Sequence, residues 1–193
     1  MADTHNEAGL NIILTGLLDA GFAAYTANPF NAANPLPADI TTVRAFQNRQ
    51  QGANITATVY FEPQDPKPVG YTGRKSNYDQ TSGQMISVEG NRYETTYHIE
   101  ALVPQSPADI NAMTESDVLD IARFILQSEG SIATLAAQNI GVLRVTGLQS
   151  NYIVDDKGQN ENVPFFEVTF SYRRELSTTV PMVEAFDTVF NRV

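Results

Sequence analysis

The chain has 193 residues, with 12 Lys and Arg against 22 Asp and Glu, two His, no Cys and no Trp, and a formal net charge of −10. This acidic balance argues against a protein that reads nucleic-acid sequence, because such proteins need a concentrated Lys/Arg surface to neutralise phosphates. The absence of cysteine excludes disulfides, thiolate zinc sites, iron–sulfur clusters and a cysteine nucleophile.

A first helix is predicted over residues 6–25. Thr4 and Glu7 have the spacing of a capping box at its start. The apolar patch at 12–18 is too short to predict a membrane span, and no basic segment of the signal-peptide kind precedes it. The apolar side chains of this helix recur with the i, i+3, i+4, i+7 spacing of one buried stripe: Leu10, Ile13, Leu14, Leu17, Leu18, Gly21, Phe22 and Tyr25.

Residues 28–37 contain three prolines and three asparagines and are predicted to be irregular, extended chain. From residue 40 to 104 the apolar pattern changes to a period of two. Alternation over 55–61 and again over 93–103 predicts two half-buried strands of an antiparallel sheet.

Residues 63–83 lie between these two strands and hold three prolines and three glycines. We expect a long loop or a hairpin here. A long stretch without regular structure is uncommon in a compact domain and is typical of a binding or mobile segment.

The second half of the chain predicts two helices and then strands. Thr114 is placed as the N-cap of a helix over 114–128, and a shorter helix follows over 131–138. Strands are predicted at 142–145 and 166–172, with a hairpin turn at 155–158 between them. We therefore expect one α+β domain over 1–193, an antiparallel β-sheet packed on α-helices, with a C-terminal tail at 180–193.

Sites for catalysis, metals and cofactors are not indicated by the sequence. The two histidines, His5 and His98, belong to no metal-binding or nucleophile motif. His98 shares one face of its strand with Glu94 and Glu100, so a His/carboxylate trio is geometrically possible there. The favoured interpretation is a solvated sheet face. We predict no catalytic, cofactor-binding or metal-binding residue.

Two segments are candidate contact surfaces. Residues 63–83 hold three of the twelve basic residues and two tyrosines, and Arg and Tyr are enriched where proteins meet; the alternative is a solvated, mobile hairpin. The tail after Pro181 is apolar and is expected to close the protein's own core or to reach a neighbouring subunit. The candidate contact residues are Lys67, Tyr71, Arg74, Lys75, Tyr78, Met182, Phe186 and Phe190.

Several short segments together carry a resemblance. They are Pro35-Leu36-Pro37 leading into Ile40–Arg44, the helix at 117–119, Gly141–Val145 and the last strand at 166–173. In this order they resemble the neck or tail terminator (tail-completion) proteins of long-tailed bacteriophages. The similarity spans about residues 35–178 and rests on element order and apolar pattern.

The resemblance implies a structural protein of the virion, located at the tail–neck junction and assembled in the host cytoplasm. Members of the tail terminator family form a six-subunit ring on the head-proximal end of the tail tube, where they stop tube polymerisation. The implied partners are further copies of the chain, the tail-tube protein, the neck or connector protein and, in contractile phages, the sheath protein. The resemblance implies no cofactor.

DNA would pass through such a ring without specific contacts. An acidic lumen suits this passage, because a negative wall repels phosphates and avoids the tight binding of a basic one. This is a hypothesis that a lumen lined mostly by Lys and Arg would contradict.

Other readings stay open at this point. One is a different head–tail joining, tube or baseplate component. Another is a small non-enzymatic binding module that uses residues 63–83 to recognise a glycan or peptide. An enzyme that uses His98 is the remaining alternative.

Overall fold

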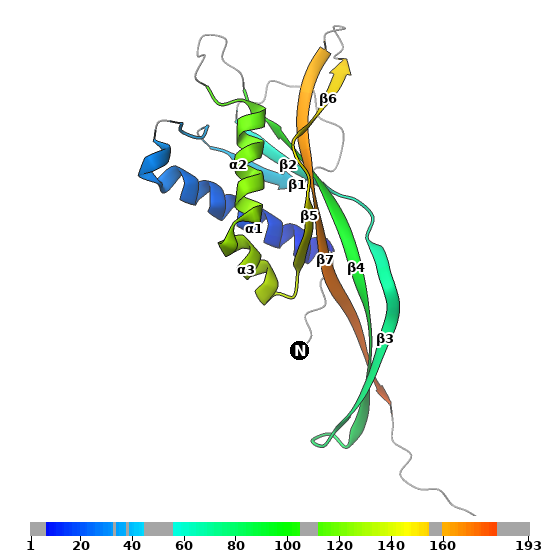
Figure 1. The fold of residues 1–193 in the computed structure, drawn as a ribbon. Helices are drawn as coiled ribbons and strands as arrows, with labels where there is room; N and C mark the ends of the chain where they lie inside the picture. The colour runs from blue at the N-terminus through cyan, green and yellow to red at the C-terminus, as the bar shows by residue number, and fades with distance from the viewer. Residues whose placement is uncertain are drawn as a thin grey trace, which may run out of the picture.

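The computed structural model describes residues 7–32, 34–37, 39–44, 56–104, 112–154 and 160–180. It confirms the predicted α+β class: a seven-stranded, mostly antiparallel sheet has its helices on one side (Figure 1). The Thr4 cap, the turn at 155–158 and the tail from residue 181 lie outside the described residues.

The helices follow the predictions closely. Thr114 caps its helix through a capping box, in which its hydroxyl accepts from the Asp117 amide and the Asp117 carboxylate accepts from the Thr114 amide. Ser128 ends this helix and also caps the next one by accepting from the Ser131 amide. The elements are α1 (Glu7–Ala27), the short 3-10 helix η1 (Pro29–Asn31), α2 (Glu115–Gln127) and α3 (Glu129–Ala137).

The sheet is built around two long strands that pair with each other. Its main order is β1-β2-β4-β7-β5, while β3 pairs with β4 and β6 pairs with β7. The strands are β1 (Thr41–Arg44), β2 (Thr58–Pro63), β3 (Lys67–Asp79), β4 (Gln84–Leu102), β5 (Gly141–Val145), β6 (Gln149–Val154) and β7 (Asn160–Val180).

The sheet is antiparallel, as predicted, except at one edge. β1 pairs with β2 in parallel, from Thr41 opposite Thr58 to Arg44 opposite Phe61. Thirteen residues connect the two strands, and a connection of about a dozen residues is long enough for the crossover that parallel strands require. Apolar alternation reports which face of a strand is buried but not the direction of its neighbour.

The core lies between the helices and one face of the sheet. Leu14, Leu18 and Phe22 of α1 are buried against it, as the predicted stripe requires. From the sheet come alternate side chains of β2, β4 and β7, in agreement with the period-two pattern: Val59, Phe61, Tyr97, Ile99, Ala101, Phe166, Val168 and Phe170.

α1 is long and apolar enough to cross a membrane when only its length and composition are considered. A core helix passes the same test, and the stripe of α1 from Leu10 to Phe22 is buried in the protein. Hydropathy therefore does not separate the two roles for this helix.

Gly21 lets α1 approach α2 closely. A Cβ at position 21 would lie 2.3 Å from Cγ2 of the buried Ile125, whereas a Cβ at Gly16 would meet nothing within 4 Å.

Gly21→Ala should therefore lower the free energy of unfolding, because overpacking costs about 1–3 kcal/mol and exceeds the helix-propensity gain of about 1 kcal/mol. Gly16→Ala is the matched control and should raise stability by up to about 1 kcal/mol. Urea unfolding measures both; a Gly21→Ala midpoint at or above wild type would contradict the close packing.

Tyr97 couples α1 to the sheet by donating its hydroxyl to Asn11 Oδ1 over 3.0 Å. Burial, reinforced by Glu7 and Tyr172, raises the pKa of this phenol above its ordinary value of 10.0. In the unfolded chain the phenol ionises near that ordinary value, whereas the folded protein keeps it neutral. Stability should therefore fall as the pH rises above about 10.

Tyr97→Phe should reduce this alkaline loss of stability, measured as the dependence of the urea midpoint on pH between 8 and 11. At neutral pH it should cost about 1 kcal/mol, because the buried bond to Asn11 is lost. Tyr71→Phe is the control, since the Tyr71 side chain is fully exposed. An equal effect of the two substitutions on the pH dependence would contradict the assignment.

Candidate assembly interface

β3, the first half of β4 and the last part of β7 form a three-stranded arm that runs beyond the helices (Figure 1). We define the arm as residues 67–92 and 173–180. The segment 63–83, expected to be a loop or a hairpin, thus supplies the outer strand of a hairpin. This strand pairs with β4 from Lys67 opposite Glu94 to Asp79 opposite Gln84.

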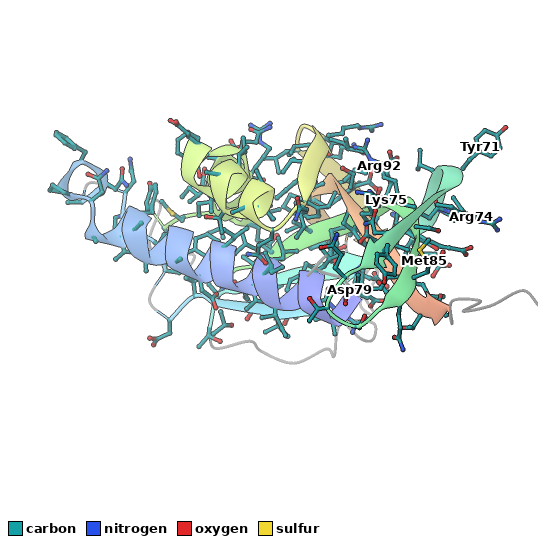
Figure 2. The ribbon with its side chains drawn as sticks, turned by 90° about the horizontal axis from the view of Figure 1, so that it is seen from below. Tyr71, Arg74, Lys75, Asp79, Met85 and Arg92 are labelled. Carbon is teal, nitrogen blue, oxygen red and sulfur yellow. The ribbon has the colours of Figure 1, made fainter. Side chains whose placement is uncertain are left out.

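The arm buries little of its own surface. In β3 only Asp79 is partly covered, and all its other residues are exposed. Tyr71 is fully exposed, and Leu176 of β7 is 67% exposed. Figure 2 shows Tyr71 and Arg74 pointing away from the rest of the molecule. Strands exposed in this way gain little from burial and suit a contact with another molecule.

Both edges of the arm are open among the residues that the structure describes. β3 pairs with β4 on one side only, and the pairing of β7 with β5 ends where Gly141 meets Ser171. Beyond that point β7 pairs with β4 alone. Open edges leave backbone donors and acceptors available to a further chain.

The five predicted contact residues that the structure describes all lie on β3. Arg74 forms an ion pair with Glu89 of β4, with Nε and Oε1 3.0 Å apart. Lys75 lies opposite Val88 and Tyr78 opposite Met85. The structure therefore brings Lys67, Tyr71, Arg74, Lys75 and Tyr78 together on one strand. Met182, Phe186 and Phe190 lie outside the described residues and stay predictions.

A β-bulge turns Tyr71 outward. The register of β3 against β4 shifts between Val69 and Gly73, and Gly70 has a φ of +81°, which a residue with a side chain rarely adopts. The bulge separates the root of the hairpin from its tip.

The hairpin ends in a compact turn centred on Asp79. Its carboxylate accepts from the Ser82 hydroxyl at 2.7 Å and from the Thr81 amide at 3.0 Å. These hydrogen bonds, the one from Ser82 first, lower the pKa of Asp79 below its ordinary value. Gly83 closes the turn with a φ of +66°. The tip is thus a defined turn.

An aromatic cluster joins the arm to the body. The rings of Tyr93 and Tyr172 stack with centroids 6.1 Å apart, and the Arg174 guanidinium lies 4.7 Å from the Tyr93 centroid. Arg174 also donates to the Tyr172 hydroxyl at 3.0 Å, and that hydroxyl contacts Thr95 Oγ1. Because cation–π contacts and aromatic pairs each contribute about 1 kcal/mol, this cluster stabilises the junction between the arm and the body.

An open groove of about 560 Å³ lies where the arm joins the body, and Arg92 and Arg173 form part of its wall. Arg92 donates to Ser171 Oγ at 2.9 Å, and Arg173 Nε contacts Glu175 at 2.8 Å. Gly90 provides the room for Arg173, since a Cβ there would lie 2.7 Å from its Nε. Arg92, Arg173 and Arg174 were missed at the sequence level because each is a charged residue within a strand. The sequence signal was limited to their position beside the predicted strands at 93–103 and 166–172.

His98 contacts Glu100, with Nε2 and Oε1 3.0 Å apart, and its ring lies 4.4 Å from that of Phe165. Glu94 lies four residues before His98 on the same face of β4 but does not complete a metal site. In the described part of the chain no three His, Asp or Glu side chains gather to hold an ion. The side chain of His98 is only 21% exposed, so this face is less solvated than expected.

The open edges and exposed side chains of the arm are suited to contacts with another protein chain. Comparison with protein families gives a match to the E217 gateway protein gp29 over residues 10–182. The chain therefore belongs to this family of phage head–tail gateway proteins. A search of curated proteins finds no match. The family agrees with a phage neck or tail-joining protein, and the narrower assignment as a tail terminator stays a prediction.

The division of β4 into body and arm can be tested by hydrogen exchange of the isolated protein. Amides of residues 95–101, whose strand is buried on one face, should exchange slowly. Those of 85–89 should exchange faster, because local opening of the arm exposes little buried apolar surface. Exchange measured residue by residue with NMR checks this, and uniform protection along β4 would contradict it.

Proposed function

We propose that this protein forms a ring at the head-proximal end of a phage tail, where it ends polymerisation of the tail tube and joins the tail to the neck. The observation that supports this best is the arm, whose open edges and exposed faces are suited to neighbouring subunits. Membership of a phage gateway family supports a structural, head–tail joining role.

A ring requires heterologous contacts, in which one surface of each copy meets a different surface of the next. The arm and the body of this chain provide two such different surfaces. The copy number of six comes from the resemblance to tail terminators. Further proposed partners are the tail-tube protein, the neck or connector protein and, in a contractile tail, the sheath protein.

The proposed role is non-enzymatic and needs no cofactor. The interactions of His98 with Glu100 and Phe165 are those of a residue held within a sheet surface. DNA would pass through the ring without specific contacts, along a wall that the acidic balance of the chain makes repulsive to phosphate. The protein would act in the virion after assembly in the host cytoplasm.

The mass of the purified protein, alone and mixed with its tail tubes, tests the proposal. We expect a closed oligomer of defined mass, or the binding of one such ring at a tube end that then stops growing. Native mass spectrometry and electron microscopy of tube length measure the two effects. A protein that stays monomeric and never associates with tubes would refute the proposal.

His98→Ala serves as the control for that experiment. If the protein is structural, this change should leave ring mass and tube capping unaltered, since His98 lies in the body part of β4 and outside the arm. A loss of capping without loss of folding would instead indicate a direct role for this side chain.

A further inference from the structure

We propose that the arm of one copy docks on the helices α1, α2 and α3 of a second copy. The contact would join a basic surface to an acidic one. This inference rests on the proposed function, because it assigns the two surfaces through which copies of the chain meet.

The arm is basic although the chain is acidic. It holds six of the twelve Lys and Arg residues but only three of the 22 acidic ones, and its formal charge is +3 in a chain of −10. The six are Lys67, Arg74, Lys75, Arg92, Arg173 and Arg174.

Strand register places four of these six on one face of the arm. Arg173 lies opposite Arg92, Lys75 opposite Val88 and Lys67 opposite Glu94. Residues directly opposite in an antiparallel pair share a face, as do alternate residues along one strand. Lys67, Lys75, Arg92 and Arg173 therefore project from the same side.

The helices carry the opposite charge. Together α1, α2 and α3 contain six acidic residues and one basic residue, Arg123, for a formal charge of −5. The acidic residues are Glu7, Asp19, Glu115, Asp117, Asp120 and Glu129. Two of these six already form ion pairs within the chain, Glu7 with Arg44 and Asp120 with Arg123. The remaining excess of acid makes the helix surface complementary to the arm, and such complementarity steers association and fixes its register.

Apolar side chains are exposed on both surfaces. Ile12 of α1 and Phe124 of α2 are 73% and 72% exposed, and the arm offers Tyr71 and Leu176. A contact between the arm and the helices would bury apolar area from both sides within a charged rim, the arrangement common in protein interfaces.

A second copy fits the arm better through its helices than through its own arm. Two arms side by side would place one positive surface against another, which the pairing of open edges would have to overcome. Arm-to-helix contact lets every copy use both surfaces, so the contact repeats around a ring and leaves no basic arm exposed.

Charge reversal on each surface tests the proposal in the full-length protein. Lys75→Glu with Arg92→Glu changes the formal charge of the arm from +3 to −1, and Asp19→Lys with Glu129→Lys changes that of the helices from −5 to −1. All four side chains belong to exposed residues, so the fold should persist, as circular dichroism and thermal unfolding would verify. Each double variant should raise the concentration for half-association at least about tenfold, in solution and at tube ends.

Mixing the two double variants should restore association between unlike copies, because the unaltered basic arm of the helix variant then meets the unaltered acidic helices of the arm variant. Arg144→Glu is the matched control: it changes an exposed basic residue outside both surfaces and should leave association unchanged. Analytical ultracentrifugation measures the equilibrium, and rising salt should weaken the wild-type contact.

Three results would overturn the inference. One is association that neither double variant weakens. Another is weakening by the arm variant alone, which would give the arm a different partner such as DNA or a tube protein. The third is a mixture that stays dissociated. In each case wild-type rings that cap tubes would keep the proposed function intact, whereas a wild-type chain that neither associates nor caps tubes would refute both.

Discussion

The antiparallel pairing of β4 with β7 is the constraint on which the rest of the structure depends. It runs from Met85 opposite Val180 to Glu100 opposite Phe165 without a break. At one end both strands are covered by helices and carry the core, and at the other end the same two strands form most of the arm. Continuous backbone pairing therefore transmits the rigidity of a packed body to a segment that could not fold alone, because isolated strands exposed on both faces are marginal in water.

The change from body to arm occurs at the cluster of Tyr93, Tyr172 and Arg174. On the body side of the cluster, alternate residues of β4 such as Thr95 and Tyr97 are buried. On the arm side, the residues of β3 and β7 that pair with β4 are exposed or half-buried. A stacked pair of tyrosines covered by a guanidinium can bury apolar surface on one side and meet water on the other. The cluster thus closes the core where no helix continues to cover the sheet.

The sequence predicts the body far better than the arm. Over 95–103 and 166–172 one face is apolar, so the period of two is visible and the strands are predicted correctly. In β3 and over residues 176–179 of β7 both faces are exposed, so no apolar alternation marks these segments. Composition alone singled out Tyr71 and Arg74. Arg92 and Arg173 are 81 positions apart in the chain, and only the register of β4 against β7 shows that they are opposite each other.

The distribution of charge gives the net value of −10 a different meaning. Copies of a uniformly acidic protein repel one another, and this repulsion opposes any closed assembly. Here half of the basic residues lie in the arm, whereas the helices carry six acidic residues against a single arginine. In the proposed arrangement most orientations of two copies remain repulsive, and the arm-to-helix orientation is attractive. Contacts between like surfaces are thereby disfavoured relative to the head-to-tail contact. The excess of acid outside the arm would then help assembly by selecting its geometry, and it would leave the remaining surface repulsive to DNA.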